Sequence, residues 1–147
     1  MRNILAERWA VNATSASRKE RTMHIQLETG GQANLIRAYA AGLITVNQDS
    51  YARSLVVLPG QIIADWPPQA FEELALAHLA ALVPLRPELL IFGTGRRQRF
   101  PRAELLAPLV EAGIGWEVMD TGAACRTYNI LMSEGRNVAA ALLMIEG

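Results

Sequence analysis

The stretch that decides the fold is Leu89-Leu90-Ile91-Phe92-Gly93-Thr94-Gly95, an apolar run that ends abruptly in a turn flanked by glycines. A short apolar run bounded in this way is typical of a strand buried on both faces. Helical and strand patterns then alternate, and we expect a helix over 101–112, a strand over 114–119, a helix over 121–134 and a strand over 138–145. This alternation indicates an α/β fold with a parallel or mixed sheet covered on both faces.

Two features refine this prediction. The strand expected at 138–145 contains the small residues Ala139–Ala141 among larger apolar ones. Small side chains of this kind favour a central strand against closely packed helices. Pro108 falls inside the helical pattern at 101–112, where proline costs about 3 kcal/mol in a helix interior. We therefore expect a late start, a kink or a break near Pro108.

The earlier part of the chain has strand-like patterns. From His24 to Asp65, apolar segments are separated by turn-forming residues, which predicts four or so short antiparallel strands. The sequence Asp65-Trp66-Pro67-Pro68 ends this sheet and starts a helix, because proline is tolerated in a first helical turn. Apolar residues then recur at helical spacing, at Phe71, Leu74, Ala75, His78, Leu79 and Leu82. We expect His78 to be a partly buried structural histidine.

Composition excludes several classes of protein. The 147 residues fit one globular domain, with 51% hydrophobic and 19% charged residues. Fourteen basic and fourteen acidic residues cancel, so nothing indicates nucleic acid or an anionic membrane as the main partner. The single cysteine excludes an internal disulfide, and with two histidines we expect no metal site. Charged residues and prolines interrupt every apolar stretch, so we expect no membrane span.

The first 22 residues differ from the rest of the chain. They carry the bases Arg2, Arg8, Arg18, Lys19 and Arg21, against two acids, Glu7 and Glu20. A basic leader of this kind is either a disordered extension or an organellar transit peptide, and the two glutamates favour the extension. We therefore divide the chain into a basic, disordered extension at 1–22 and a single domain at 23–147. We expect a cytoplasmic location, or an organellar matrix if 1–22 is a transit peptide.

The turn after the strand at 89–92 combines glycines with arginines. Gly93 and Gly95 permit positive φ and close backbone approach, and four arginines follow, at Arg96, Arg97, Arg99 and Arg102. Exposed amides and guanidinium groups suit a phosphate or a carboxylate. However, Gln98 stands where a dinucleotide fingerprint has its third glycine, and no P-loop lysine follows. We favour a solvated basic loop, with a generic anion or protein contact left open.

The helix expected at 121–134 begins at Asp120-Thr121, and either residue is a suitable N-cap. Cys125 lies near the amino end of this helix beside Arg126, where the helix dipole and the cation both favour a thiolate. Against a nucleophile, no histidine lies close in sequence, and a lone cysteine among alanines is usually a small buried hydrophobic residue. We favour the structural thiol and assign no catalytic residue.

Seven short motifs follow one another along the second half of the chain. They are Phe92-Gly93-Thr94-Gly95, Gly113-Ile114, Asp120-Thr121, Ala124-Cys125, Thr127-Tyr128-Asn129, Glu134-Gly135-Arg136 and Ala140-Ala141-Leu142. Taken in this order, they resemble the Mth938-like family, formerly a domain of unknown function. Within that family the resemblance is to the branch that includes the mitochondrial respiratory complex I assembly factor, and it spans roughly residues 23 to 147.

The resemblance implies a three-layer α/β/α fold with a mixed central sheet and a β-rich N-terminal portion. It implies no catalytic residue and no cofactor, and it favours a non-enzymatic assembly or interaction factor with a protein partner, respiratory complex I being the candidate target. The alternative is a binder or an enzyme for a small anionic ligand at the loops 93–102 and 120–129. The candidate ligand or partner surface comprises Gly93, Thr94, Gly95, Arg96, Arg97, Asp120, Thr121, Cys125, Arg126, Asn129 and Arg136.

Overall fold

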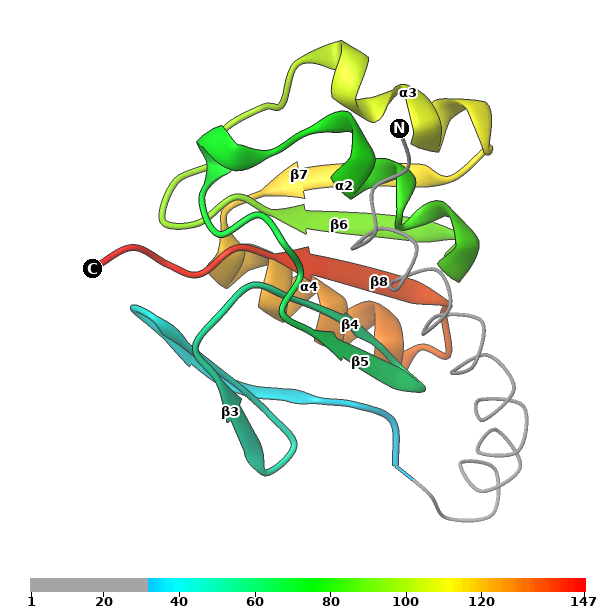
Figure 1. The fold of residues 1–147 in the computed structure, drawn as a ribbon. Coiled ribbons are helices and arrows are strands. Elements are labelled where there is room, and N and C mark those ends of the chain that lie inside the picture. Colours follow the sequence, from blue (N-terminus) through cyan, green and yellow to red (C-terminus); the bar gives the residue numbers. More distant parts are fainter. Residues whose placement is uncertain (1–31) are drawn as a thin grey trace.

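A computed structural model describes residues 32–147 (Figure 1). The extension expected at 1–22 and the start of the strand pattern at His24 lie outside the described residues. Eight strands form two sheets: β1 (Ile36–Ala40), β2 (Leu43–Val46), β3 (Asp49–Tyr51), β4 (Leu55–Leu58), β5 (Gln61–Ala64), β6 (Leu89–Gly93), β7 (Gly115–Met119) and β8 (Val138–Leu142). The helical segments are η1 (Phe71–Glu73), α2 (Leu76–Ala80), η2 (Val83–Leu85), α3 (Ala103–Glu111) and α4 (Thr121–Ser133).

The larger sheet has five strands in the order β5-β4-β8-β6-β7. Strand β6 pairs in parallel with both β7 and β8, whereas β4 pairs antiparallel with β5 and β8, so the sheet is mixed. The smaller sheet is an antiparallel meander of β1, β2 and β3. The predicted β-rich first part is confirmed, although residues 36–64 hold five strands rather than about four.

Helices cover both faces of the five-stranded sheet, which confirms the three-layer α/β/α architecture (Figure 1). Successive side chains of a strand point to opposite faces. Leu90 and Phe92 of β6 therefore pack with α3 residues such as Leu109, while Ile91 packs with α4. The smaller sheet contributes Ile36, Ile44 and Val46 to the core on the α4 side.

Strand β8 lies at the centre of the larger sheet, as its alanines predict. All five of its residues are buried, and Ala140 stands opposite Ile91 of β6 and Val57 of β4. The strand ends at Leu142, three residues earlier than expected. The chain then leaves the larger sheet, and Ile145 forms a β-bridge to Ala41, which directly follows β1 of the smaller sheet.

The helix expected after Pro68 is broken into η1, α2 and η2. Ala75 has an extended backbone, with φ −133° and ψ 162°, and this conformation separates η1 from α2. Helix α3 begins two residues later than expected and then runs through Pro108 without a break. The missing amide of Pro108 would have bonded the carbonyl of Glu104, and Glu104 is exposed, so water can bond that carbonyl instead.

His78 is half-buried on α2, as expected for a structural histidine. Its Nδ1 accepts a hydrogen bond from the amide of Ala75 at 3.0 Å, and its ring stands edge-on to Trp66, with ring centroids 6.5 Å apart. Burial lowers the pKa of His78, and the nearby charge of Glu73 opposes that shift. The neutral imidazole is therefore the form that caps α2.

Candidate functional site

The structure brings together the turn Gly93–Gly95 and the start of α4. The Thr94 amide donates to the carbonyl of Met119 at 2.9 Å, and the Thr121 amide donates to the carbonyl of Gly95 at 2.8 Å. The amide of Gly95 in turn donates to Oγ1 of Thr121 at 2.8 Å. The backbone groups that were candidates for anion binding are therefore used to join the two loops.

Thr121 also connects this junction to the segment after β8. Its hydroxyl donates to the carbonyl of Leu143 at 2.7 Å, while the amide of Leu143 donates to the carbonyl of Gly93 at 3.0 Å. A Cβ added at Gly93 would lie 3.0 Å from Oγ1 of Thr121 and 3.0 Å from a methyl carbon of Leu142. The junction is closely packed and leaves no room for a phosphate group.

Five residues of the candidate surface lie in the interior of the protein. These are Gly93, Thr94, Gly95, Thr121 and Cys125. Cys125 is 1% exposed and packs from α4 into the core on that side of the five-stranded sheet. Desolvation by burial raises the pKa of the Cys125 thiol to about 12, and the charge of Arg126 only partly offsets this effect. The thiol is thus a buried core group rather than part of a surface, because the adjacent cation does not compensate for the loss of water.

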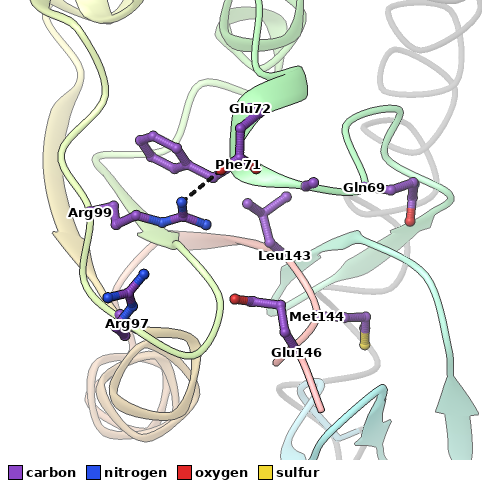
Figure 2. Close-up of a pocket in the computed structure, with 9 residues that line it drawn as sticks. Gln69, Phe71, Glu72, Arg97, Arg99, Leu143, Met144 and Glu146 are labelled. Carbon is purple, nitrogen blue, oxygen red and sulfur yellow. Dashed lines mark hydrogen bonds and ion pairs between the residues drawn. The ribbon is translucent and has the colours of Figure 1, made fainter.

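Two of the arginines that follow Gly95, the exposed Arg97 and the half-buried Arg99, border a pocket of about 310 Å³ (Figure 2). Arg97 and Arg99 extend from one side of this pocket, and Glu146 extends from the other. Oε1 of Glu146 accepts a hydrogen bond from the amide of Arg96 at 3.0 Å. Gly95 has φ +96°, and a Cβ there would lie 2.0 Å from that same carboxylate oxygen. Glycine is therefore required for the carboxylate to reach the loop.

Arg99, which was not among the predicted site residues, fixes the wall of this pocket. Its guanidinium bonds the carboxylate of Glu72 at 2.7 Å and lies 4.7 Å from the ring centroid of Phe71. A hydrogen bond from the backbone of Glu72 itself, and then Arg99, lower the pKa of the Glu72 carboxyl. The sequence shows the arginine but not its partners, since Phe71 and Glu72 come from a segment more than 20 residues earlier.

A second pocket of about 330 Å³ shares the lining residues Phe71, Glu72 and Arg99 with the first. Five of its eight lining residues are apolar, and the other three are Glu72, Arg99 and Arg102. The apolar lining residues are Phe71, Leu74, Phe100, Pro101 and Leu105. Phe100 is 68% exposed, more than any other exposed large hydrophobic residue in the described range 32–147. Sequence reasoning missed Phe100, although its place among four arginines was visible.

The remaining predicted residues have separate roles. Asp120 caps α4 by accepting the amide of Ala123 at 2.9 Å. Arg126 donates to the hydroxyl of Tyr39 on β1, and Asn129 bonds both backbone groups of Ile36, at 2.9 and 2.8 Å. These two side chains therefore attach the smaller sheet to α4.

Arg136 is not part of the same region. It follows α4 and lies 3.5 Å from Glu88, which precedes β6, whereas Gly93 ends that strand. Arg136 therefore lies at the opposite end of the five-stranded sheet from the Gly93 turn.

Within the described range 32–147, no three His, Cys, Asp or Glu side chains are grouped so that they could hold a metal ion. No helix in that part of the chain is long and apolar enough to cross a membrane.

The architecture and the junction of the Gly93 turn with α4 define a Mth938-like α/β domain, and solved structures agree. A Mth938-like domain from Bordetella pertussis is 36% identical, with a TM-score of 0.69, over 77% of this chain and 87% of that one. The chain belongs to the family described as protein of unknown function (DUF498/DUF598), whose sequence model matches residues 36–143.

Relatives in this family have different names. NADH dehydrogenase [ubiquinone] 1 alpha subcomplex assembly factor 3 from Danio rerio is 32% identical over 85% of this chain and 72% of its own length. A protein named 13 kDa major membrane protein from Francisella tularensis is 27% identical over 73% of this chain and 88% of its own length.

Proposed function

We propose that this protein is a non-enzymatic assembly or interaction factor that binds a protein partner, with respiratory complex I as its target. The observation that carries the proposal is the closed junction at Gly93–Gly95 and Thr121. In open α/β sheets, ligands bind beyond the carboxyl ends of the parallel strands. Here that position is filled by the protein's own hydrogen bonds. What stays exposed beside it is a surface of arginines and Phe100.

The similarity to an assembly factor supports the same proposal. The predicted location, in the cytoplasm or in an organellar matrix, is part of it and is tested by fractionation of cells that express the full chain.

The test is deletion of the gene in the source organism, followed by native gel electrophoresis of its respiratory complexes. We expect less assembled complex I and recovery when the full-length protein is restored. Pull-down of the tagged protein should enrich complex I subunits or other assembly factors. An unchanged amount and activity of complex I in the deletion strain would contradict the proposal.

A second candidate function is the binding of a small anionic ligand, favoured by Arg97 and Arg99 at the 310 Å³ pocket. Against it, Glu72 and Glu146 line the same pocket and balance the two cations. A thermal-shift screen of phosphates, nucleotides and carboxylates tests this candidate, since a ligand at 100 times its Kd adds about 2.7 kcal/mol of stability. A screen without a stabilising compound, or a stabilising effect that survives Arg97→Ala, would count against it.

A further inference from the structure

The pocket at Phe100 combines apolar and charged side chains, as a docking site for a side chain with charged neighbours requires. We call it the Phe100 pocket and define it by the apolar residues Phe71, Leu74, Phe100, Pro101 and Leu105 together with the charged residues Glu72, Arg99 and Arg102. Its volume of about 330 Å³ exceeds that of one large apolar side chain. Exposed apolar surface rimmed by polar residues is characteristic of interaction sites on soluble domains.

The loop that carries Phe100 is held in place although it has no regular secondary structure. The hydroxyl of Thr94 donates to the carbonyl of Arg97 at 2.6 Å and accepts from the amide of Arg99 at 3.1 Å. The side chain of Gln98 donates to the carbonyl of Val118 at 2.9 Å. The Thr94 bonds close the loop on itself and the Gln98 bond joins it to β7, all on the N-terminal side of Phe100, so little conformational entropy remains to be lost on binding.

Both sides of Phe100 are also fixed. The Arg99 side chain lies over the Phe71 ring and bonds Glu72, while Pro101 is buried. Aromatic and arginine side chains that are positioned before binding are the residues that contribute most to protein interfaces. Phe100 is 68% exposed although its neighbours are fixed, so its ring is positioned for contact with a partner.

The charge around the pocket indicates the chemistry of the occupant. Arg96, Arg97, Arg99 and Arg102 occur within seven positions, with no acidic residue between them. Glu72 is paired with Arg99, and Glu146 is bonded to the backbone of Arg96. Arg102 is exposed and has no ion-pair partner among residues 32–147. The unpaired charge at the edge of the pocket is therefore positive and complements an acidic partner.

We propose that the Phe100 pocket binds an acidic segment of a partner protein that inserts one large apolar side chain. The apolar side chain contacts Phe71, Phe100 and Leu105, and the flanking carboxylates contact Arg102 and its neighbours. This inference rests on the proposed function, because it names the kind of partner segment that an interaction factor of this structure recognises.

The first test uses the full chain and an array of nine-residue peptides. The central residue is varied among leucine, isoleucine, phenylalanine and alanine, and the flanking residues among aspartate, asparagine and lysine. We expect binding only by peptides with acidic flanks and a large apolar centre, and weaker binding in high salt because these charges are exposed. Equal binding of neutral and acidic peptides, of alanine-centred peptides, or no binding by any peptide would overturn the proposal.

The second test locates the binding and uses matched controls. Phe100→Ala should weaken the best peptide roughly tenfold or more, whereas Ile130→Ala, at a residue 58% exposed on α4, should leave affinity unchanged. Arg102→Glu should weaken binding, and Arg136→Glu, at the opposite end of the sheet, should not. Thermal unfolding of each variant checks that it is folded. Equal effects of Phe100→Ala and Ile130→Ala would refute the location.

The same variants separate this inference from the proposed function. If deletion of the gene lowers complex I but the Phe100→Ala protein restores it fully, then the Phe100 pocket is not the docking site and the proposed function stands. If deletion leaves complex I unchanged, the proposed function fails, while peptide binding still reports on the pocket by itself.

Discussion

The hydroxyl of Thr121 should contribute more to stability than its methyl group. Thr121→Val keeps the shape of the side chain and removes the hydroxyl, which accepts from the amide of Gly95 and donates to the carbonyl of Leu143. Thr121 is 0% exposed, so both backbone groups are left unsatisfied in the interior. Each such group costs about 1–3 kcal/mol, and we expect a total loss of about 2–6 kcal/mol.

The comparison with Thr121→Ser makes the reasoning testable. That variant keeps the hydroxyl and loses one methyl group, worth about 1 kcal/mol. Urea unfolding should therefore rank the proteins as parent, then Thr121→Ser, then Thr121→Val, with an unchanged m-value. A loss of about 3 kcal/mol also corresponds to roughly 6–12 °C in Tm.

The control is Thr127→Val, at a half-buried threonine further along α4, for which we expect a change within about 0.5 kcal/mol. If Thr121→Val is as stable as the parent, or more stable than Thr121→Ser, then the hydrogen bonds of Thr121 do not hold the junction together. The account of the closed loops would then be wrong.

Three further predictions follow from the same structure. Gly95→Ala should destabilise the protein by at least about 1 kcal/mol more than Gly113→Ala, because both residues have positive φ but only the Gly95 position is occupied by a carboxylate oxygen; equal losses in urea unfolding would refute this. Cys125, with its pKa raised to about 12, should resist iodoacetamide at pH 8 unless the protein is unfolded. Because the folded protein prefers the neutral thiol, Cys125 contributes to the free energy of unfolding below pH 9, and this contribution is lost as the pH rises toward 12. Cys125→Ala should therefore reduce the loss of stability at alkaline pH. The pKa of His78 is lowered, so its contribution to the free energy of unfolding is present above pH 6.5 and lost as the pH falls through the folded-state pKa. In urea unfolding, His78→Gln should make that free energy less dependent on pH between 7.5 and 5. An unchanged pH dependence would contradict the role of the neutral ring.

The second half of the fold could be predicted because each element has a continuous local pattern with a clear end. Gly113 and Gly135 adopt positive φ just before β7 and just after α4, where the sequence places chain reversals. Residues 71–85 could not be predicted in the same way. Their apolar spacing fits one helix, but Phe71 and Glu72 contact Arg99, and the extended backbone at Ala75 divides the segment.

For the candidate site, the sequence identified the two turns but not what fills them. Gly95 and Thr121 both suit an anion site by residue type, and only the fold shows that each occupies the other's hydrogen-bonding position. The partner of Thr121 at Leu143 lies 22 residues away, and Glu146 reaches Arg96 across 50 residues. No local sequence pattern indicates contacts between residues so far apart in the chain. Phe100 was missed because an exposed aromatic residue in a loop does not disturb any periodicity.

The position of β8 also has a consequence for biosynthesis. Val138–Leu142 separates β4 from β6 in the sheet, yet it follows both of them in the chain, and its pairing joins Leu142 to Leu55. A ribosome therefore releases β4 and β6 before the strand that connects them exists. Until then the nascent chain carries two apolar strands without their shared neighbour, which is the condition in which chaperones are most needed. Strands β4 and β8 are far apart in the chain, so their pairing also makes folding slow compared with that of a helical domain of the same length.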